Sequence, residues 1–117
     1  MKLYKTLSLL NLNLLFLSCS HNYEPIISSI SANPNPVEPE GTVNLICNAS
    51  DNDESNILKN ETLTYVWFSE HGEILSGIES HTAMWYAPSD SGIFSISCEV
   101  RDQNNGLDIS IIEIAVK

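Results

Sequence analysis

The chain has 117 residues and a mass of 13.0 kDa, which leaves room for one domain and excludes a multidomain enzyme. Five basic residues stand against 15 acidic ones and give a formal charge of −10, so the basic footprint of a nucleic-acid-binding protein is missing. Apolar residues make up 43% of the chain and aromatic residues 8%, shares that are typical of a packed core rather than a disordered acidic tail.

The first 18 residues have the pattern of a signal peptide. Lys2 and Lys5 precede a leucine-rich stretch that ends at Leu17, and Asn11 and Asn13 interrupt it. This stretch is shorter than the roughly 18 apolar residues that span a bilayer, so we predict that it directs export and is removed. A buried core helix is the alternative interpretation.

Leu15-Phe16-Leu17-Ser18-Cys19 resembles the lipobox of bacterial lipoproteins, in which the cysteine receives diacylglycerol and becomes the mature N-terminus. Ser18 and Cys19 match this motif, whereas the two positions before Ser18 depart from its usual leucine and small residue. The resemblance implies a lipid anchor at Cys19, a location in the cell envelope and, because Ser20 rather than Asp follows the cysteine, the outer membrane. An ordinary secretory signal that is cut near Ser18 or Ser20 remains the alternative.

Residues 19–24 then form a lipidated cysteine and a short polar tether, and residues 25–117 form the folded domain. In this domain, segments rich in Val, Ile, Thr and aromatic residues alternate with turn signals, and no stretch keeps a period of 3.6 residues. The pattern predicts an all-β fold. The expected strands are 26–32, 42–49, 63–68, 74–75, 92–101 and 108–116.

Two of the three cysteines lie on the predicted inner face of their strands. Cys47 alternates in phase with Val43 and Leu45, and Cys98 alternates in phase with Phe94. If Cys19 carries a lipid, an even pair remains, and a Cys47–Cys98 disulfide would close a loop of about 50 residues and add about 4 kcal/mol of stability. The cysteine count therefore supports the anchor and the disulfide together.

An inward cysteine, a central tryptophan at Trp67 and a second inward cysteine occur in the order that resembles the immunoglobulin superfamily. Phe94 departs from that family, which places an aromatic residue two positions before the second cysteine. The segments Ala49-Ser50-Asp51-Asn52-Asp53, Leu63-Thr64-Tyr65-Val66-Trp67, Trp85-Tyr86-Ala87-Pro88 and Val100-Arg101-Asp102 are similar to successive landmarks of bacterial PKD-like domains. The expected fold is an immunoglobulin-like, PKD-like β-sandwich of about seven strands, with Trp67, Tyr65 and Phe94 in its core.

Acidic side chains follow the two strands that carry the inward cysteines. Asp51 and Asp53 follow the first of them, Asp102 and Asp108 flank the turn after the second, and the two loops emerge at the same end of such a sandwich. Calcium prefers oxygen ligands of this kind, although the spacing matches no EF-hand. The alternative is that these residues cap turns and keep the domain soluble.

Adjacent aromatic residues at Trp85 and Tyr86 form a second candidate site. In a strand one of them faces outward, where it is suited to grip a sugar or a peptide; the alternative is that it covers the edge of the core. His21, His71 and His81 stand outside any recognisable catalytic motif. We therefore expect no enzymatic activity and no required cofactor.

The sequence as a whole predicts a non-catalytic cell-surface lipoprotein that is held to the membrane by its lipid and binds or spaces an unidentified protein or glycan. One alternative is a secreted immunoglobulin-type receptor, which the glycosylation sequons at Asn48 and Asn60 would suit. The other alternative is an accessory or inhibitor domain of an enzyme.

Overall fold

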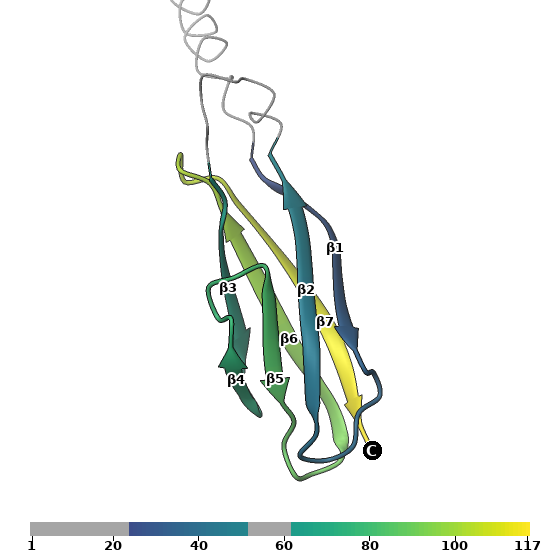
Figure 1. Ribbon diagram of the computed structural model, residues 1–117. Coiled ribbons are helices and arrows are strands. Elements are labelled where there is room, and N and C mark those ends of the chain that lie inside the picture. The colour runs from purple at the N-terminus through teal and green to yellow at the C-terminus, as the bar shows by residue number, and fades with distance from the viewer. Residues whose placement is uncertain (1–23, 52–61) are drawn as a thin grey trace, which may run out of the picture.

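The computed structural model of the chain describes residues 24–51 and 62–117. The predicted signal peptide, Cys19 and Asp53 therefore lie outside the described residues. No helix in these two ranges is long and apolar enough to cross a membrane. The described chain folds into seven strands (Figure 1): β1 (Ile26–Asn33), β2 (Thr42–Ser50), β3 (Thr64–Ser69), β4 (Glu73–Ser76), β5 (Thr82–Tyr86), β6 (Gly92–Arg101) and β7 (Leu107–Val116).

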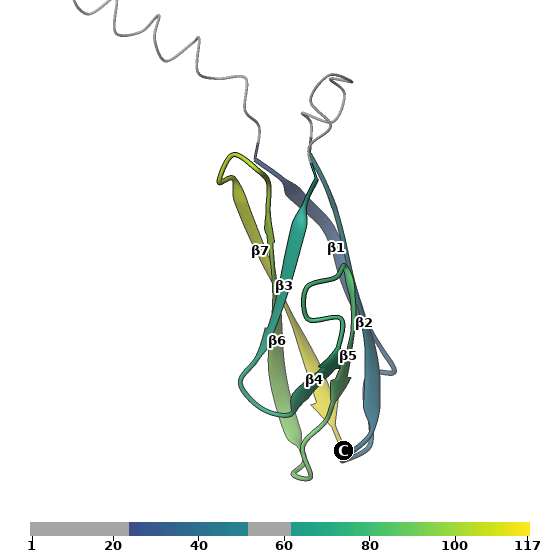
Figure 2. The same ribbon diagram turned by 60° about the vertical axis from the view of Figure 1, so that its left-hand side comes forward.

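The strands form two antiparallel sheets that pack face to face. One sheet has the order β1-β2-β5-β4 and the other has the order β3-β6-β7 (Figure 2). The prediction of an all-β, immunoglobulin-like sandwich is confirmed, and the expected strands 26–32, 42–49, 63–68, 92–101 and 108–116 agree with β1, β2, β3, β6 and β7 to within one residue. The expected pair 74–75 lies inside β4, and β5 is an additional strand that the predicted set lacks.

Alternation along the strands builds the core between the two sheets. β2 buries every second residue from Val43 to Cys47, and the second half of β6 does the same. Trp67 and Trp85 are the two largest fully buried side chains, so each sheet contributes one tryptophan to the core. The prediction that Trp67 anchors the core is confirmed, whereas Tyr65 and Phe94 are only partly buried and pack against its margin.

A segment that contains two prolines carries the chain from one sheet to the edge of the other. After β1 the Asn35 amide donates to the Glu113 carbonyl at 3.0 Å, and its oxygen accepts the Ala115 N–H at 3.0 Å. Val37 then forms a parallel bridge with Val116. This segment covers the C-terminal half of the β7 edge, which would otherwise present unpaired backbone groups to other chains.

The turn between β3 and β4 requires a glycine. Gly72 has a φ of +73°, and a Cβ atom at this position would lie 2.5 Å from the Tyr86 carbonyl oxygen and 2.6 Å from the indole nitrogen of Trp85. The turn therefore packs directly on the edge of the Trp85 ring. This close approach fixes the turn between β3 and β4 against β5.

The two ends of the sandwich differ in what they carry. The chain enters the domain beside the turn between β6 and β7, and both β2 and β6 end there (Figure 1). The C-terminus lies at the opposite end, together with the connections from β1 to β2 and from β5 to β6. Any anchor that precedes the domain is thus attached at the end where Asp51 and Asp102 follow their strands.

Candidate functional site

The two inward cysteines meet in the core, as their positions in the sequence predict. Cys47 and Cys98 come from facing sheets, both are fully buried, and the two thiols share a hydrogen bond. Trp67 is the register partner of Cys98 and lies on the neighbouring strand. Both cysteines are thiols in this structure, so the predicted disulfide stays a prediction.

Burial determines the chemistry of this pair. Loss of solvation raises the pKa of the Cys98 thiol, and the neighbouring Cys47 raises it further. Loss of solvation also raises the pKa of the Cys47 thiol, although the hydrogen bond with Cys98 acts in the opposite direction. Because the thiolate is the nucleophilic form, two thiols that resist ionisation are suited to packing rather than to nucleophilic catalysis.

Both buried tryptophans use their indole N–H to hold a loop. Trp67 Nε1 donates to the Ser80 carbonyl at 2.7 Å, and its backbone N–H donates to the Ile78 carbonyl at 2.9 Å. Trp85 Nε1 donates to the His71 carbonyl at 2.9 Å. The connections on either side of β4 are therefore attached to the core through these two side chains.

The predicted ligand-binding role of Trp85 is wrong in this structure. Trp85 is fully buried because it points inward in phase with Ala83 and Ala87, whose small side chains leave room for its ring. Tyr86 faces outward and is 37% exposed. Of the two aromatic residues, only Tyr86 remains available for a contact with a ligand, and that role stays a prediction.

Asp102 closes the turn between β6 and β7. Its Oδ1 atom accepts the backbone N–H of Asn104 at 2.8 Å and the backbone N–H of Gly106 at 2.6 Å. The residue is 8% exposed, and its Oδ2 atom would lie 2.5 Å from a Cβ atom on Gly106. This carboxylate is thus enclosed by the turn that it organises.

Asp108 ties the two sheets together at the same end. Its Oδ2 atom accepts the Ile27 N–H at 2.8 Å, which joins the start of β7 to the start of β1, and its Oδ1 atom accepts the Ile109 N–H at 3.0 Å. Asp51 is 2% exposed and directly follows β2.

Within residues 24–51 and 62–117, no three Asp, Glu, His or Cys side chains gather closely enough to hold a metal ion. The predicted calcium set also includes Asp53, which lies outside the described residues, so calcium binding stays a prediction. The observed hydrogen bonds of Asp102 and Asp108 match the alternative role in turns.

The two histidines of the domain lie on the surface. The His71 ring stacks at a tilt on Phe94 with 5.4 Å between ring centroids, and its Nε2 atom lies 3.8 Å from a Glu70 carboxylate oxygen. The His81 ring lies 6.0 Å from Tyr65. Both residues are exposed, as expected for residues in turns.

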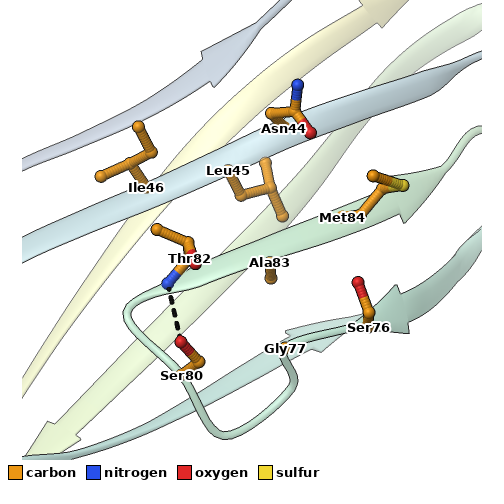
Figure 3. A pocket seen from close by; sticks show the side chains of 9 residues that line it. All are labelled: Asn44, Leu45, Ile46, Ser76, Gly77, Ser80, Thr82, Ala83 and Met84. Atoms are coloured by element: carbon orange, nitrogen blue, oxygen red, sulfur yellow. Dashed lines mark hydrogen bonds between the residues drawn. The ribbon is translucent and has the colours of Figure 1, made fainter.

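A shallow hollow of about 510 Å³ lies on the outer surface of the four-stranded sheet (Figure 3). It opens where the register between β4 and β5 shifts after Ile74 and the chain turns back at Gly77. It is lined by uncharged residues of β2, β4, β5 and the connection between β4 and β5: Asn44, Leu45, Ile46, Ser76, Gly77, Ser80, Thr82, Ala83 and Met84. Sequence reasoning missed this surface because it depends on the shifted register.

The sandwich is similar to several solved structures. A nucleoside hydrolase-related protein from Saccharophagus degradans, described as associated with carbohydrate metabolism, is 22% identical with a TM-score of 0.63; the match covers 82% of this chain and 26% of that one. The PKD1 domain of Vibrio anguillarum Epp is 14% identical with a TM-score of 0.58, and the match covers 82% of this chain and 96% of that domain. A lipoprotein from Bacteroides thetaiotaomicron is 12% identical with a TM-score of 0.44, over 74% of this chain and 77% of that one, a likeness too low to support an argument.

These comparisons show the fold: the chain is an immunoglobulin-like β-sandwich, similar in structure to a PKD domain. It spans about a quarter of the length of the Saccharophagus protein, so a sandwich of this kind occurs there as one part of a larger chain. No family model matches the sequence, and no curated protein is similar to it in sequence.

Proposed function

We propose that this chain is an exported, lipid-anchored module of a bacterial cell envelope, and that its sandwich binds or spaces other molecules without catalysing a reaction. The N-terminal sequence supports the anchor, because Cys19 follows a signal-like segment and a lipobox-like motif. Three acyl chains, as in the lipoproteins that the motif resembles, would hold the protein stably where a single chain would not.

The observation that carries the proposal is the position of the PKD-type sandwich directly behind that cysteine. β1 begins at Ile26, and the six residue steps from Cys19 to Pro25 can span at most about 22 Å. An anchored sandwich would therefore stand close to the bilayer with the Asp102 turn toward it. The opposite end, where β5 runs into the connection to β6, would face away from the membrane.

The use of the polar side chains supports a role without catalysis. Asp102 and Asp108 accept backbone N–H groups, and the two tryptophans donate to backbone carbonyls, so these groups stabilise the sandwich itself. The buried thiols resist ionisation. What remains at the surface is suited to non-covalent contacts with a protein or a glycan.

Membrane fractionation tests the anchor. The full-length chain expressed in a Gram-negative host should need detergent for extraction, and Cys19→Ser should release it in soluble form, whereas the matched variant Ser20→Ala should remain in the membrane. Ser20→Asp should move the protein from the outer to the inner membrane, because the residue after the lipidated cysteine directs sorting in the lipoproteins that it resembles. A wild-type protein that is soluble without detergent would overturn the proposal.

A role as an accessory domain of an enzyme is the second candidate. The similar sandwich in the nucleoside hydrolase-related protein forms about a quarter of that chain, which is the arrangement expected of an accessory domain. A partner enzyme that co-purifies with the wild-type protein in a fixed ratio would favour this function over an independent surface module.

A further inference from the structure

The outer face of the three-stranded sheet carries large apolar side chains that nothing in the described chain covers. Val66 and Phe68 on β3 are 43% and 64% exposed, and Ile109 and Ile111 on β7 are 52% and 63% exposed. Single exposed apolar residues are normal on a protein surface, but a continuous group of them marks a contact surface. These four residues belong to one face of one sheet, which Figure 2 shows from the side.

The register of the sheet turns this face into a groove. Ser97 on the central strand β6 pairs with Phe68 on one side and with Ile111 on the other. Because neighbouring strands lie about 4.8 Å apart, the two apolar walls stand roughly 10 Å apart above a floor of small serines. The resulting hollow has a volume of about 200 Å³ and is lined by Phe68, Glu70, Ser95, Ser97 and Ile111. Its width suits one large apolar side chain.

Acidic side chains border the groove. Glu70 lines the groove itself with a side chain that is 81% exposed, and Glu113 stands opposite Ser95 in the register. Glu99 lies on the same face of β6, two residues after Ser97, and forms an ion pair with Arg101. Arg101 is one of only two Lys or Arg residues within residues 24–51 and 62–117. The two carboxylates of Glu70 and Glu113 therefore face an incoming partner with little compensating positive charge.

We propose that this groove docks a segment of another protein that presents one large apolar side chain flanked by Lys or Arg. The apolar side chain would lie between Phe68 and Ile111 over the two serines, and the flanking cations would contact Glu70 and Glu113. This inference rests on the proposed binding role and names the surface and the partner for it.

The negative charge of the chain favours this partner over the two others that an apolar face could contact, a second copy of the chain and a lipid bilayer. A second copy of the chain would bring the same carboxylates against this face and a formal charge of −10 against a charge of −10. An anionic bilayer would be repelled for the same reason. The same negative electrostatic potential that repels a second copy and an anionic bilayer attracts a cationic protein segment.

A peptide-binding assay on the full-length protein tests the proposal. The protein is taken from the cell fraction that contains it, and if it is membrane-anchored it is kept in nanodiscs of neutral phosphatidylcholine. The probes are three synthetic peptides: a central Phe flanked by Lys, the same Phe flanked by Glu, and a central Ser flanked by Lys. We expect the first peptide to bind. The Ser-centred peptide should bind at least about tenfold more weakly, the scale of a lost Phe contact. The Glu-flanked peptide should also bind more weakly, because Glu70 and Glu113 repel its carboxylates. Amide NMR shifts caused by the first peptide should fall on β3, β6 and β7.

Variants locate the contact. Phe68→Ser should weaken binding of the Lys-flanked Phe peptide at least about tenfold, whereas Ile46→Ser on the outer face of the opposite sheet should leave it within about twofold. Glu70→Gln combined with Glu113→Gln should weaken binding and remove most of its salt dependence.

Four results would overturn the proposal: no binding of the Lys-flanked Phe peptide at about 1 mM, equal binding of the Ser-centred peptide, unchanged binding by Phe68→Ser, or self-association that this substitution abolishes. None of these outcomes depends on where the protein fractionates, so a failure of the groove is distinct from a failure of the anchor.

Discussion

Replacing Asp102 with Ala should destabilise the domain, because its carboxylate accepts two backbone N–H groups of the turn between β6 and β7. The change leaves the N–H groups of Gly106 and Asn104 without their acceptor, the first of them in a buried position and the second in a half-buried one. A buried donor without a partner costs about 1–3 kcal/mol and a half-buried one about half as much, so we expect a total loss of about 2–4 kcal/mol. For a domain of about 90 residues this corresponds to a fall in Tm of roughly 10–20 °C.

Urea denaturation followed by tryptophan fluorescence measures this loss, since Trp67 and Trp85 are both buried. Asp102→Asn keeps an oxygen at the Oδ1 position and should lose about half as much stability as Asp102→Ala. Asp90→Ala, at an exposed residue near the other end of the sandwich, should change the free energy of unfolding by less than about 0.5 kcal/mol. If Asp102→Ala were as stable as the Asp90 control, the carboxylate would not be holding the turn.

Three further predictions concern the turn, the thiols and the acidic end. Gly72→Ala should cost about 2–4 kcal/mol in urea denaturation, because the new methyl group meets the Tyr86 carbonyl and the Trp85 ring at a positive φ; a loss below about 1 kcal/mol would contradict that contact. Burial raises the pKa of both thiols, so the unfolded chain binds fewer protons than the folded chain above pH 9.0, and the reduced protein should lose stability as the pH rises past that value. The non-reduced protein and a Cys47→Ala/Cys98→Ala double variant should lack the loss of stability that the thiols cause. An identical dependence of stability on pH for all three proteins would contradict the raised thiol pKa values. Addition of EGTA should leave the Tm unchanged if the acidic residues serve only the turns, whereas a clear fall would support the calcium site.

Most of the sandwich can be predicted from local alternation. Val43, Leu45 and Cys47 define one buried face of β2 without any knowledge of its neighbours, and the same holds for the residues around Cys98 on β6. Trp67 is predictable for the same reason, since it stands in phase within a strand bounded by turn residues. Local pattern suffices here because each strand has one face in the core and one face in solvent.

The strand β5 and the burial of Trp85 escape this reasoning. Ala83, Trp85 and Ala87 share the inner face, but small residues carry little apolar signal, and the adjacent Tyr86 obscures the phase. The edge of the Trp85 ring also packs on Gly72, which belongs to the turn between β3 and β4. A long-range fit of this kind is not encoded in the local pattern of either segment.

The roles of the acidic residues also could not be predicted from the sequence alone. The sequence places Asp102 and Asp108 around one turn and leaves two roles open, as metal ligands or as turn caps. The choice depends on partners that the fold supplies, such as the Ile27 N–H, which lies far away along the chain. The groove between Phe68 and Ile111 likewise depends on which residues the register places opposite Ser97.

The mass of the intact, detergent-extracted and non-reduced protein tests the central claim most directly. The proposal predicts a chain that starts at an acylated Cys19 and is two hydrogens lighter than its reduced form, because Cys47 and Cys98 lie together in the core and would be joined. A chain that starts elsewhere with an unmodified Cys19, or one that carries glycan at Asn48 or Asn60, would contradict the lipoprotein and favour a secreted receptor.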